Sequence, residues 1–445
     1  MLTGGAWAFA GKIVTGLSGV LISALLARLL YPEELAAYFL TFSLVSFIVV
    51  VVQLGMTNSI VRFVAEAVAV RQYARGRSAI QKSLLLTLGA SATAGIVLLN
   101  GGWLWLSTHV AHSKLVSGVS LAGVCWMFLL AFQGLLAEIF RGFNDIKSAT
   151  IFGGLTTALL SLAMFAGLYA VSERGGLDKI VLISVLAVCG SVLLALPFMS
   201  RNISGLAKRG DVMTAKELLT VSFPLWGSYL FLFVLLQADV WILAAFRPQS
   251  EVAIYGAASR LASLIALPLM VVNAVIPPIM ANYYARDMKQ ELEKVLRTVA
   301  TLSGVPLVII ILVLIPFGGF VLRLTFGSFY EAGAVAFTLL CIGQIVNVWM
   351  GSPGLLLVQA AKQRVLFVIT LCNGVVTLLL LILLVRLGGY NGAAAASMLG
   401  VIFQNIATWF ACLRIIGVDT RSYPPSKLPG LFAAHRHLLT LRVHD

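Results

Sequence analysis

Twelve apolar stretches of about 20 residues fill most of the chain, and each is long enough to cross the hydrocarbon core of a bilayer as a helix. Hydrophobic residues make up 60% of the 445 residues and charged residues only 11%. A soluble fold could not bury so much apolar surface, so the pattern predicts an all-α polytopic membrane protein. The stretches lie at residues 5–30, 38–58, 83–106, 115–137, 149–171, 179–199, 218–246, 252–280, 298–322, 332–351, 365–386 and 392–414.

The basic residues are distributed unevenly between these stretches. Seventeen Lys and Arg residues lie on connections that follow even-numbered stretches, against seven on odd-numbered connections and adjacent helix ends. The positive-inside rule then places both termini in the cytoplasm. The net charge of +14 is therefore read as a topology signal and an attraction to anionic membrane lipids, rather than as a nucleic-acid-binding surface.

Two segments of the chain resemble each other. "LARLLYPEELAAYFL" follows the first stretch and "LAAFRPQSEVAIYGA" follows the seventh, so that Pro32 and Tyr38 correspond to Pro248 and Tyr255. This repeat predicts two pseudo-symmetric lobes of six helices each, related by an axis along the membrane normal. The predicted units are an N-terminal lobe (1–199), a basic cytoplasmic linker (200–217), a C-terminal lobe (218–415) and a basic cytoplasmic tail (416–445).

Enzymatic motifs are missing from the sequence. It contains no Walker A, HExxH or GxSxG pattern and no acidic pair in a long external loop. The five cysteines lie in apolar stretches without CxxC spacing, which indicates neither a disulfide framework nor a metal site. We therefore expect a protein that is not an enzyme and that holds no metal and no cofactor.

Charged residues inside the apolar stretches are the first candidates for function, because such groups usually face a bundle interior or a wet path. Lys12 lies about 12 Å into the first helix, too deep for easy escape to the interface, and is predicted to line a cavity. Arg28 at the end of that helix is either an interface anchor or a substrate ligand. Asp239 and Arg260 lie at similar depth on the seventh and eighth helices. They either neutralise each other, or Arg260 faces the cavity while Asp239 tunes it or carries a proton.

Amide side chains are also numerous in or near the stretches. Some will join helices by hydrogen bonds, but their number favours a hydrated cavity that suits a sugar-bearing substrate. The full set is Gln53, Asn58, Gln133, Gln237, Asn273, Gln344, Asn347, Gln359, Asn373, Gln404 and Asn405. Those expected to line the cavity are Gln53, Asn58, Gln237, Asn273, Asn347 and Asn373.

Five further segments carry a family resemblance: "LLARLLYPEELAAYFL" (25–40), "LGMTNSIVRFVAE" (54–66), "DVWILAAFRPQSEVAIYGAASRL" (239–261), "LTFGSFYEAGAVAFTLL" (324–340) and "GGYNGAAAASMLG" (388–400). In their order and spacing the chain resembles the polysaccharide-transporter family of the MOP (MATE-like) flippase superfamily, which includes Wzx-type O-antigen and exopolysaccharide flippases. The resemblance covers residues 1 to about 418. It departs at "PEELAAY", where the family usually has Gly in place of Ala37.

The resemblance implies two six-helix lobes around a central cavity in the bacterial inner membrane. It implies a cargo of polyprenyl-diphosphate-linked oligosaccharide, turned from the cytoplasmic to the outer leaflet by alternating access for surface polysaccharide biosynthesis. Family cavities carry cations on the first and eighth helices, the helices of Lys12 and Arg260. The energy would come from H⁺, Na⁺ or the membrane potential, and polysaccharide polymerase or assembly proteins would be partners.

Three alternatives stay open at this stage. A MATE-like exporter of small cations keeps the fold, but it favours acidic cavity residues, and Asp239 is the one clear mid-span carboxylate. A membrane polysaccharide polymerase or acyltransferase requires a larger external loop with catalytic groups than the short loop near His109 and His112. A scaffold for a polysaccharide-assembly complex is the third.

Overall fold

The computed structural model describes residues 2–171, 175–204 and 212–423, and every regular element within them is a helix. Ten helical stretches in this part of the chain are long and apolar enough to cross a membrane. They correspond to eleven of the twelve predicted spans with shifted ends, because the 54-residue stretch Gln363–Ile416 holds two. The ninth predicted span begins in α15 (Lys289–Leu314). The prediction of an all-α polytopic membrane protein is confirmed.

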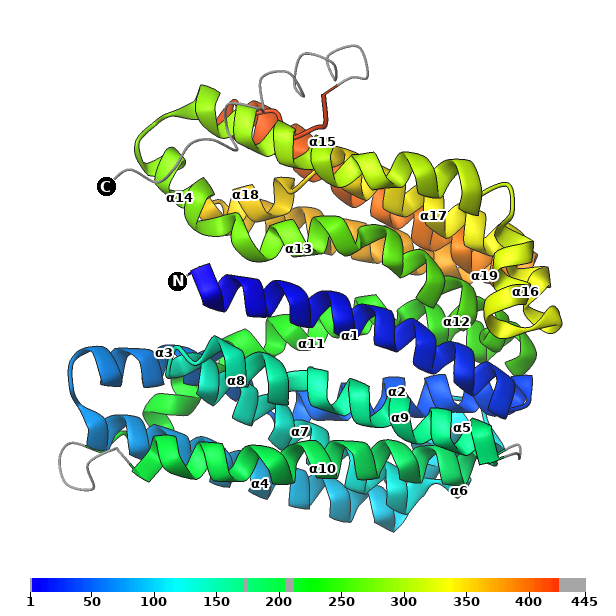
Figure 1. Cartoon of the computed structure of the whole chain (residues 1–445), viewed down its shortest axis with the longest axis horizontal. Helices are drawn as coiled ribbons and strands as arrows, with labels where there is room; N and C mark the ends of the chain where they lie inside the picture. Colours follow the sequence, from blue (N-terminus) through cyan, green and yellow to red (C-terminus); the bar gives the residue numbers. More distant parts are fainter. Residues whose placement is uncertain (1, 172–174, 205–211, 424–445) are drawn as a thin grey trace.

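The first half of the chain forms one group of helices, drawn from blue to green in the lower part of Figure 1. Two of its spans are bent within π-helical turns, at Gly101 and Gly154. The elements are α1 (Leu2–Leu29), α2 (Pro32–Val52), α3 (Met56–Ala69), α4 (Tyr73–Val97), η1 (Leu98–Gly102), α5 (Trp103–His109), α6 (Lys114–Gly118), α7 (Ser120–Gly142), α8 (Ile146–Thr150), η2 (Ile151–Leu155), α9 (Thr156–Val171) and α10 (Leu177–Ser204).

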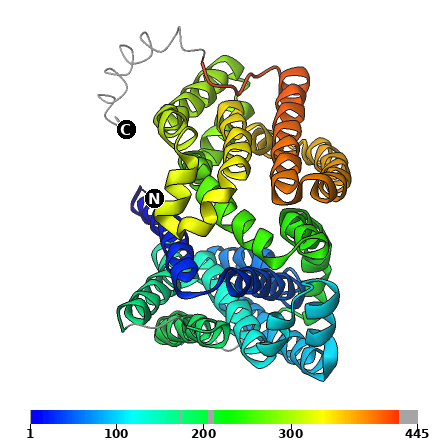
Figure 2. The ribbon, with the colours of Figure 1, turned by 90° about the vertical axis from the view of Figure 1, so that its right-hand side faces the viewer.

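The second half of the chain forms the other group, and Figure 2 shows the two groups one above the other. Besides α15, its elements are α11 (Ala215–Phe246), α12 (Gln249–Ser263), η3 (Leu264–Ala266), α13 (Leu267–Val275), α14 (Pro277–Ala285), α16 (Gly318–Phe326), η4 (Ser328–Gly333), α17 (Ala334–Met350), α18 (Pro353–Gln359), α19 (Gln363–Ala411) and η5 (Cys412–Ile416).

The helix ends gather at two ends of the molecule. Helices α3, α14 and α18 lie at the same end as the N-terminus, here called the N-terminal end, whereas α5, α6 and α16 lie at the far end (Figure 1). Basic connections next to α3, α14 and α18 are among those predicted to face the cytoplasm. The fold therefore brings these connections to one side, as the charge pattern requires.

Helix α1 packs between the two groups. It contacts α8 and α9 on one side and α12, α13 and α16 on the other. Glycines allow the close approach, because a Cβ atom at Gly11 would lie 2.1 Å from Thr150 Cγ2 and one at Gly16 would lie 2.9 Å from Leu267 Cδ2. The first helix is thus a shared wall of both groups.

Helix α11 also contacts both groups. At its start, Ser222 and Ser59 share a hydrogen bond of 2.5 Å between their hydroxyl oxygens, and the Trp226 ring N–H donates to the carbonyl of Val50 at 3.1 Å. Its other contacts include α12 and α19. The predicted boundaries around the linker (200–217) stay a prediction, and residues 205–211 of that linker and 424–445 of the predicted tail lie outside the described residues.

Two glycines form the turn between the last two spans. Gly389 has φ +56° and breaks the helical geometry of α19 there. Gly392 lies where the two arms approach most closely, because a Cβ atom on it would lie 1.8 Å from the carbonyl oxygen of Leu384. The two predicted spans are therefore joined as a hairpin with almost no connecting loop.

Residues 417–423, here called the C-terminal strap, bind the helix ends at the N-terminal end of the second group. The backbone N–H of Asp419 donates to Glu293 Oε2 at 3.1 Å, and its carboxylate accepts from the Trp409 ring N–H at 2.9 Å. The N–H of Tyr423 donates to Thr301 Oγ1 at 2.9 Å. The strap thereby ties α15 to the end of α19.

We expect Asp419→Asn to lower the unfolding temperature at neutral pH. Burial acts to raise the pKa of Asp419, but hydrogen bonds from Arg421 and Trp409 outweigh it and leave the pKa below its ordinary value. A carboxyl group whose pKa is lower in the folded protein stabilises the fold at any pH above its pKa in the unfolded chain, which is about 3.9. That stabilisation is lost as the pH falls through the lower pKa of the folded protein. The loss at neutral pH is about 1–3 kcal/mol.

Thermal unfolding in detergent between pH 3 and pH 7 measures this effect. The difference between wild type and Asp419→Asn should shrink toward the acidic end. Asp287→Asn is the matched control, because the Asp287 side chain is 85% exposed. A difference that stays constant with pH would contradict the assignment.

Candidate functional site

Four neighbouring cavities form a chain through the two groups of helices, each sharing wall residues with the next. The aromatic cavity in the first group holds about 280 Å³ and is lined by Tyr38, Phe39, Phe42 and Trp126 together with Arg260 of α12. The other three are defined below by their own residues. Together the four cavities are lined by aromatic, charged and amide side chains.

Arg260 is the cation of the aromatic cavity. Its guanidinium carbon lies 5.6 Å from the ring centroid of Phe39 and 5.8 Å from that of Phe42, within cation–π range. Its side chain borders both the aromatic cavity and the neighbouring central cavity. Among the described residues no carboxylate forms an ion pair with it, so its charge is available to a ligand.

The central cavity connects the two groups. It holds about 270 Å³ and shares Arg260 with the aromatic cavity, and its wall also contains Gln237 and Asp239. Gln237 therefore lies where the sequence predicted a cavity amide. Arg260 and Asp239 do line a common space, as their similar depth predicted.

Asp239 is held by partners other than Arg260. The Tyr255 hydroxyl donates to Asp239 Oδ2 at 2.5 Å, and the backbone N–H of Val240 donates to Oδ1 at 2.8 Å. Tyr255 Oη also lies 3.1 Å from Ser397 Oγ. Of the two arrangements left open above, the structure shows the one in which Asp239 and Arg260 are separate.

The tyrosines of the repeat occupy matching positions in the two groups. Tyr38 Oη lies 3.3 Å from Ser184 Oγ of α10, just as Tyr255 Oη lies near Ser397 of α19. Each tyrosine thus joins the second helix of its group to the last one. In the sequence they marked only the repeat, yet Tyr38 also lines the aromatic cavity and Tyr255 holds Asp239 at the edge of the central cavity.

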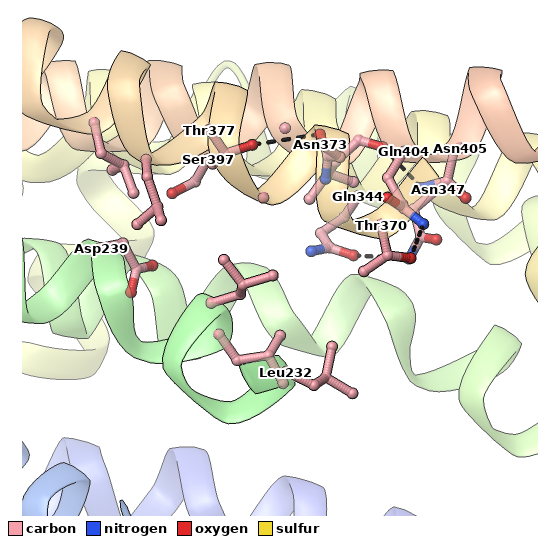
Figure 3. Close-up of a pocket in the computed structure, with 17 residues that line it drawn as sticks. Leu232, Asp239, Gln344, Asn347, Thr370, Asn373, Thr377, Ser397, Gln404 and Asn405 are labelled. Carbon is pink, nitrogen blue, oxygen red and sulfur yellow. Dashed lines mark hydrogen bonds between the residues drawn. The ribbon is translucent and has the colours of Figure 1, made fainter. Parts of the chain in front are cut away.

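The amide cavity is the largest of the four, at about 390 Å³, and lies wholly within the second group between α11, α17 and α19 (Figure 3). It shares Leu236 and Asp239 with the central cavity. Asn347 and Asn373, two of the predicted cavity amides, are among the residues that line it. Its other hydrogen-bonding wall residues are Gln344, Thr370, Thr377, Ser397, Gln404 and Asn405.

The terminal cavity continues from the amide cavity through shared Asn347 and Asn405 and holds about 200 Å³. Asn273 lines it and accepts a hydrogen bond from the hydroxyl of Ser352. Three of the predicted cavity amides, Asn273, Asn347 and Asn373, thus follow one another along the second group.

Lys12 lines none of these four cavities, but it lies on the helix face that does. Thr15, Gly19 and Ser23 of α1 line the aromatic cavity, and Lys12 precedes them by three, seven and eleven residues, the spacing of one helical face. The Lys12 side chain is exposed, and no described residue pairs with it. It therefore stands at the N-terminal end of the cavity wall.

Three other predicted site residues line none of the four cavities, and their part in a site stays a prediction. The Arg28 guanidinium donates to the carbonyl of Leu324 at 2.8 Å and so joins α1 to α16. Gln53 Nε2 donates to the carbonyl of Ala131 at 3.2 Å, because the end of α2 faces α7. Asn58 is exposed near the start of α3. Arg28 lies in the first span as predicted. The second span ends at Val52, however, which leaves Gln53 at its C-terminal cap and Asn58 in α3.

Gln133 shows the reverse case. Its amide nitrogen donates to Thr157 Oγ1 at 2.6 Å, to Ser191 Oγ at 2.9 Å and to the carbonyl of Phe152 at 2.8 Å, while the residue lines the aromatic cavity. The sequence marked it as an amide within a span but did not place it at the site. Trp126, with a buried ring N–H that has no partner among the described atoms, carried no sequence signal.

Comparison with known proteins gives two family matches. The family described as "Polysaccharide biosynthesis protein" matches residues 1–284, and the family described as MatE matches residues 224–384. No curated protein matches the chain.

Solved structures share the fold at low sequence identity. An inward-facing multidrug resistance MATE family transporter of the MOP superfamily is 15% identical, with a TM-score of 0.75 over 91% of this chain and 98% of its own. The lipid II flippase MurJ in an inward closed conformation is 14% identical, with a TM-score of 0.70 over 100% and 94%. A MOP superfamily transporter from Pyrococcus furiosus, described as having a binding pocket of reverse polarity, is 14% identical, with a TM-score of 0.65 over 93% and 94%.

Proposed function

Because the chain belongs to the polysaccharide biosynthesis protein family, we propose that it is a flippase for a polyprenyl-diphosphate-linked oligosaccharide. It is a multi-pass membrane protein with the fold of MOP superfamily transporters. The proposal adds that it serves surface polysaccharide biosynthesis in a bacterial inner membrane with both termini in the cytoplasm.

Arg260 is the observation that carries this proposal. A diphosphate that crosses the membrane needs a cation in a region where water is scarce, since charges interact far more strongly there than in bulk water. Arg260 supplies a guanidinium that two cavities share and that no described carboxylate neutralises. A guanidinium also matches phosphate geometry, because it can donate two parallel hydrogen bonds.

The contacts at the far end support loading from the N-terminal end. There Arg28 joins α1 to α16, and the side-chain amide of Gln249 donates to the carbonyl of Ala111 at 3.2 Å, across the two groups. At the opposite end the exposed Lys12 leads to the cavity wall. In this proposal the structure is the loading state of an alternating-access cycle, with the prenyl chain left in the lipid.

Lys12→Ala is expected to slow substrate capture about fivefold. An exposed cation contributes up to about 1 kcal/mol to an ion pair, much less than a cation in a water-poor site. Lys12→Arg should change the rate less than twofold, because the charge is kept. Initial uptake of a fluorescent polyprenyl-diphosphate sugar into vesicles measures this, and equal rates for wild type and Lys12→Ala would exclude Lys12 from capture.

Asp239 is proposed as the coupling group for H⁺ or Na⁺, since it is the carboxylate at the junction of the central and amide cavities. We expect Asp239→Asn to reduce the response of transport to an imposed pH or Na⁺ gradient at least about tenfold. Glu331→Gln is the control, because that side chain is 51% exposed in η4. An unchanged gradient response in Asp239→Asn would show that Asp239 is not the coupling group.

A MATE-like exporter is the second candidate, favoured by the MatE match over residues 224–384 and by the carboxylate of Asp239. The two candidates differ in the charge of the cargo, which is positive for the exporter and negative for the flippase. A cationic drug would be attracted by Asp239 and repelled by Arg260, whereas a diphosphate would experience the reverse.

Gene deletion in the native bacterium separates the two functions. The flippase predicts that surface polysaccharide disappears and that the lipid-linked unit accumulates on the cytoplasmic face, with rescue by wild type but not by Arg260→Gln. The exporter predicts unchanged polysaccharide and new sensitivity to cationic drugs. The second outcome would overturn the proposed cargo while leaving the fold intact.

A further inference from the structure

The amide cavity has one apolar wall and one mixed wall. On one side α11 presents Leu232, Leu235 and Leu236 (Figure 3). On the other, α17 and α19 present amide and hydroxyl groups together with Leu378, Leu381 and Val401. Its volume of about 390 Å³ falls within the range of small-molecule sites. A pyranose ring has the same division, with an apolar C–H face and a rim of hydroxyl groups.

The amide wall retains unused hydrogen-bonding capacity. Gln404 Nε2 donates to Thr370 Oγ1 at 3.0 Å, yet its Oε1 is buried and has no partner among the described atoms. Asn347 Nδ2 donates to Gln344 Oε1 at 3.1 Å, which leaves the nitrogen of Gln344 and the oxygen of Asn347 without described partners. These residues hold one another in place while offering both donors and acceptors.

A mixture of free donors and acceptors is suited to hydroxyl groups, which donate and accept at once. Amides that only joined helices would use their capacity on the protein, as Gln53 does when its Nε2 donates to the carbonyl of Ala131 in α7 at 3.2 Å. The buried acceptor of Gln404 is costly to leave without a partner, because it has lost its hydrogen bonds to water. Rotation of the Gln404 side chain toward the cavity would bring this oxygen to a ligand hydroxyl.

The charged groups in the wall of the amide cavity indicate which sugars it can accept. The wall of the amide cavity contains no Lys, Arg or His, and its one ionisable carboxylic acid is Asp239. A sugar with its own carboxylate would enter a space without a cation and with a negative group at one end. Neutral and N-acetylated sugars avoid that repulsion.

We propose that the amide cavity is the sugar subsite and that it selects sugars without a carboxylate, an inference that rests on the proposed function. The diphosphate is held by Arg260 in the neighbouring central cavity, and the first sugars reach across Leu236 and Asp239 into the amide cavity. Gln344 and Gln404 are the residues that recognise hydroxyl groups there.

The test uses the full-length protein in lipid nanodiscs and three probes: a C20 prenyl diphosphate, the same lipid carrying N-acetylglucosamine, and the same lipid carrying glucuronic acid. Fluorescence titration gives the affinities. We expect N-acetylglucosamine to tighten binding about tenfold over the bare diphosphate, the effect of two neutral hydrogen bonds, and glucuronic acid to add nothing. This comparison within wild type needs no variant to fold.

Variants then show which residues cause the gain in affinity from N-acetylglucosamine. Gln404→Ala and Gln344→Ala should each reduce the gain from N-acetylglucosamine to below threefold and leave the affinity of the bare diphosphate unchanged. Asn58→Ala is the matched amide control outside the cavities and should keep the full gain. Arg260→Gln should weaken all three probes alike.

Three results would overturn the sugar subsite: no gain from N-acetylglucosamine, an equal gain from glucuronic acid, or an equal loss in Asn58→Ala and Gln404→Ala. Failure of the proposed function has a different signature. In that case the bare diphosphate itself would not bind, or its affinity would not depend on Arg260.

Discussion

Arg260→Gln is expected to lower transport of the lipid-linked cargo between about tenfold and a hundredfold. Hydrogen bonds to charged groups contribute about 1.5–3 kcal/mol, and each 1.4 kcal/mol is a tenfold change. No described cation replaces Arg260 in the aromatic or central cavity, because Lys12 lies outside both. Glutamine keeps most of the side-chain length and loses the charge, so the change reports on electrostatics.

Transport into vesicles at matched protein levels measures the loss. Arg260→Lys should retain part of the activity, because the charge remains but the forked geometry does not. Arg323→Gln is the control, since that side chain is 62% exposed at the far end. Wild-type transport by Arg260→Gln would remove the central argument for an anionic cargo.

Gly392→Ala is expected to prevent the last two spans from packing. The added Cβ atom would lie 1.8 Å from the carbonyl oxygen of Leu384, a backbone atom that cannot rotate away. A Cβ atom at this position would force the two arms of the hairpin apart. We expect the loss of folding free energy to exceed the roughly 0.5–3 kcal/mol that is usual for a substitution. We expect most of the protein to be lost from the membrane.

Folded yield and unfolding temperature in detergent test this expectation. Gly388→Ala is the matched control, because a Cβ atom there would have no neighbour within 4 Å. A normal yield for Gly392→Ala would show that the hairpin opens without cost, contrary to the geometry described.

The fold was predictable from the sequence to the extent that hydropathy determines it. Span length and charge asymmetry identified eleven of the twelve spans among the described residues and put the basic connections at one end, because each depends on composition alone. The breaks at Gly101 and Gly154 and the strap were not predicted. Those features depend on contacts between distant segments, such as Asp419 with Glu293, which no local pattern records.

The residues of the candidate site were also predictable only in part. Arg260 and Asp239 were found because an ionisable group inside an apolar span is conspicuous. Gln53 and Gln133 look alike in sequence, yet the first packs α2 against α7 and the second lines the aromatic cavity. Their difference is a matter of helix rotation, which follows from packing and not from the residue.

The C-terminal strap has a consequence for biogenesis. Domains generally fold in the order in which the ribosome delivers them, at about 5–20 residues per second. Helix α15 is made more than a hundred residues before Asp419 and Tyr423, on which Glu293 and Thr301 depend. The second group therefore completes its contacts only when the last part of the described chain has been made. A stop codon before residue 417 would release a protein whose spans are all inserted but whose helix α15 lacks its hydrogen bonds to the strap.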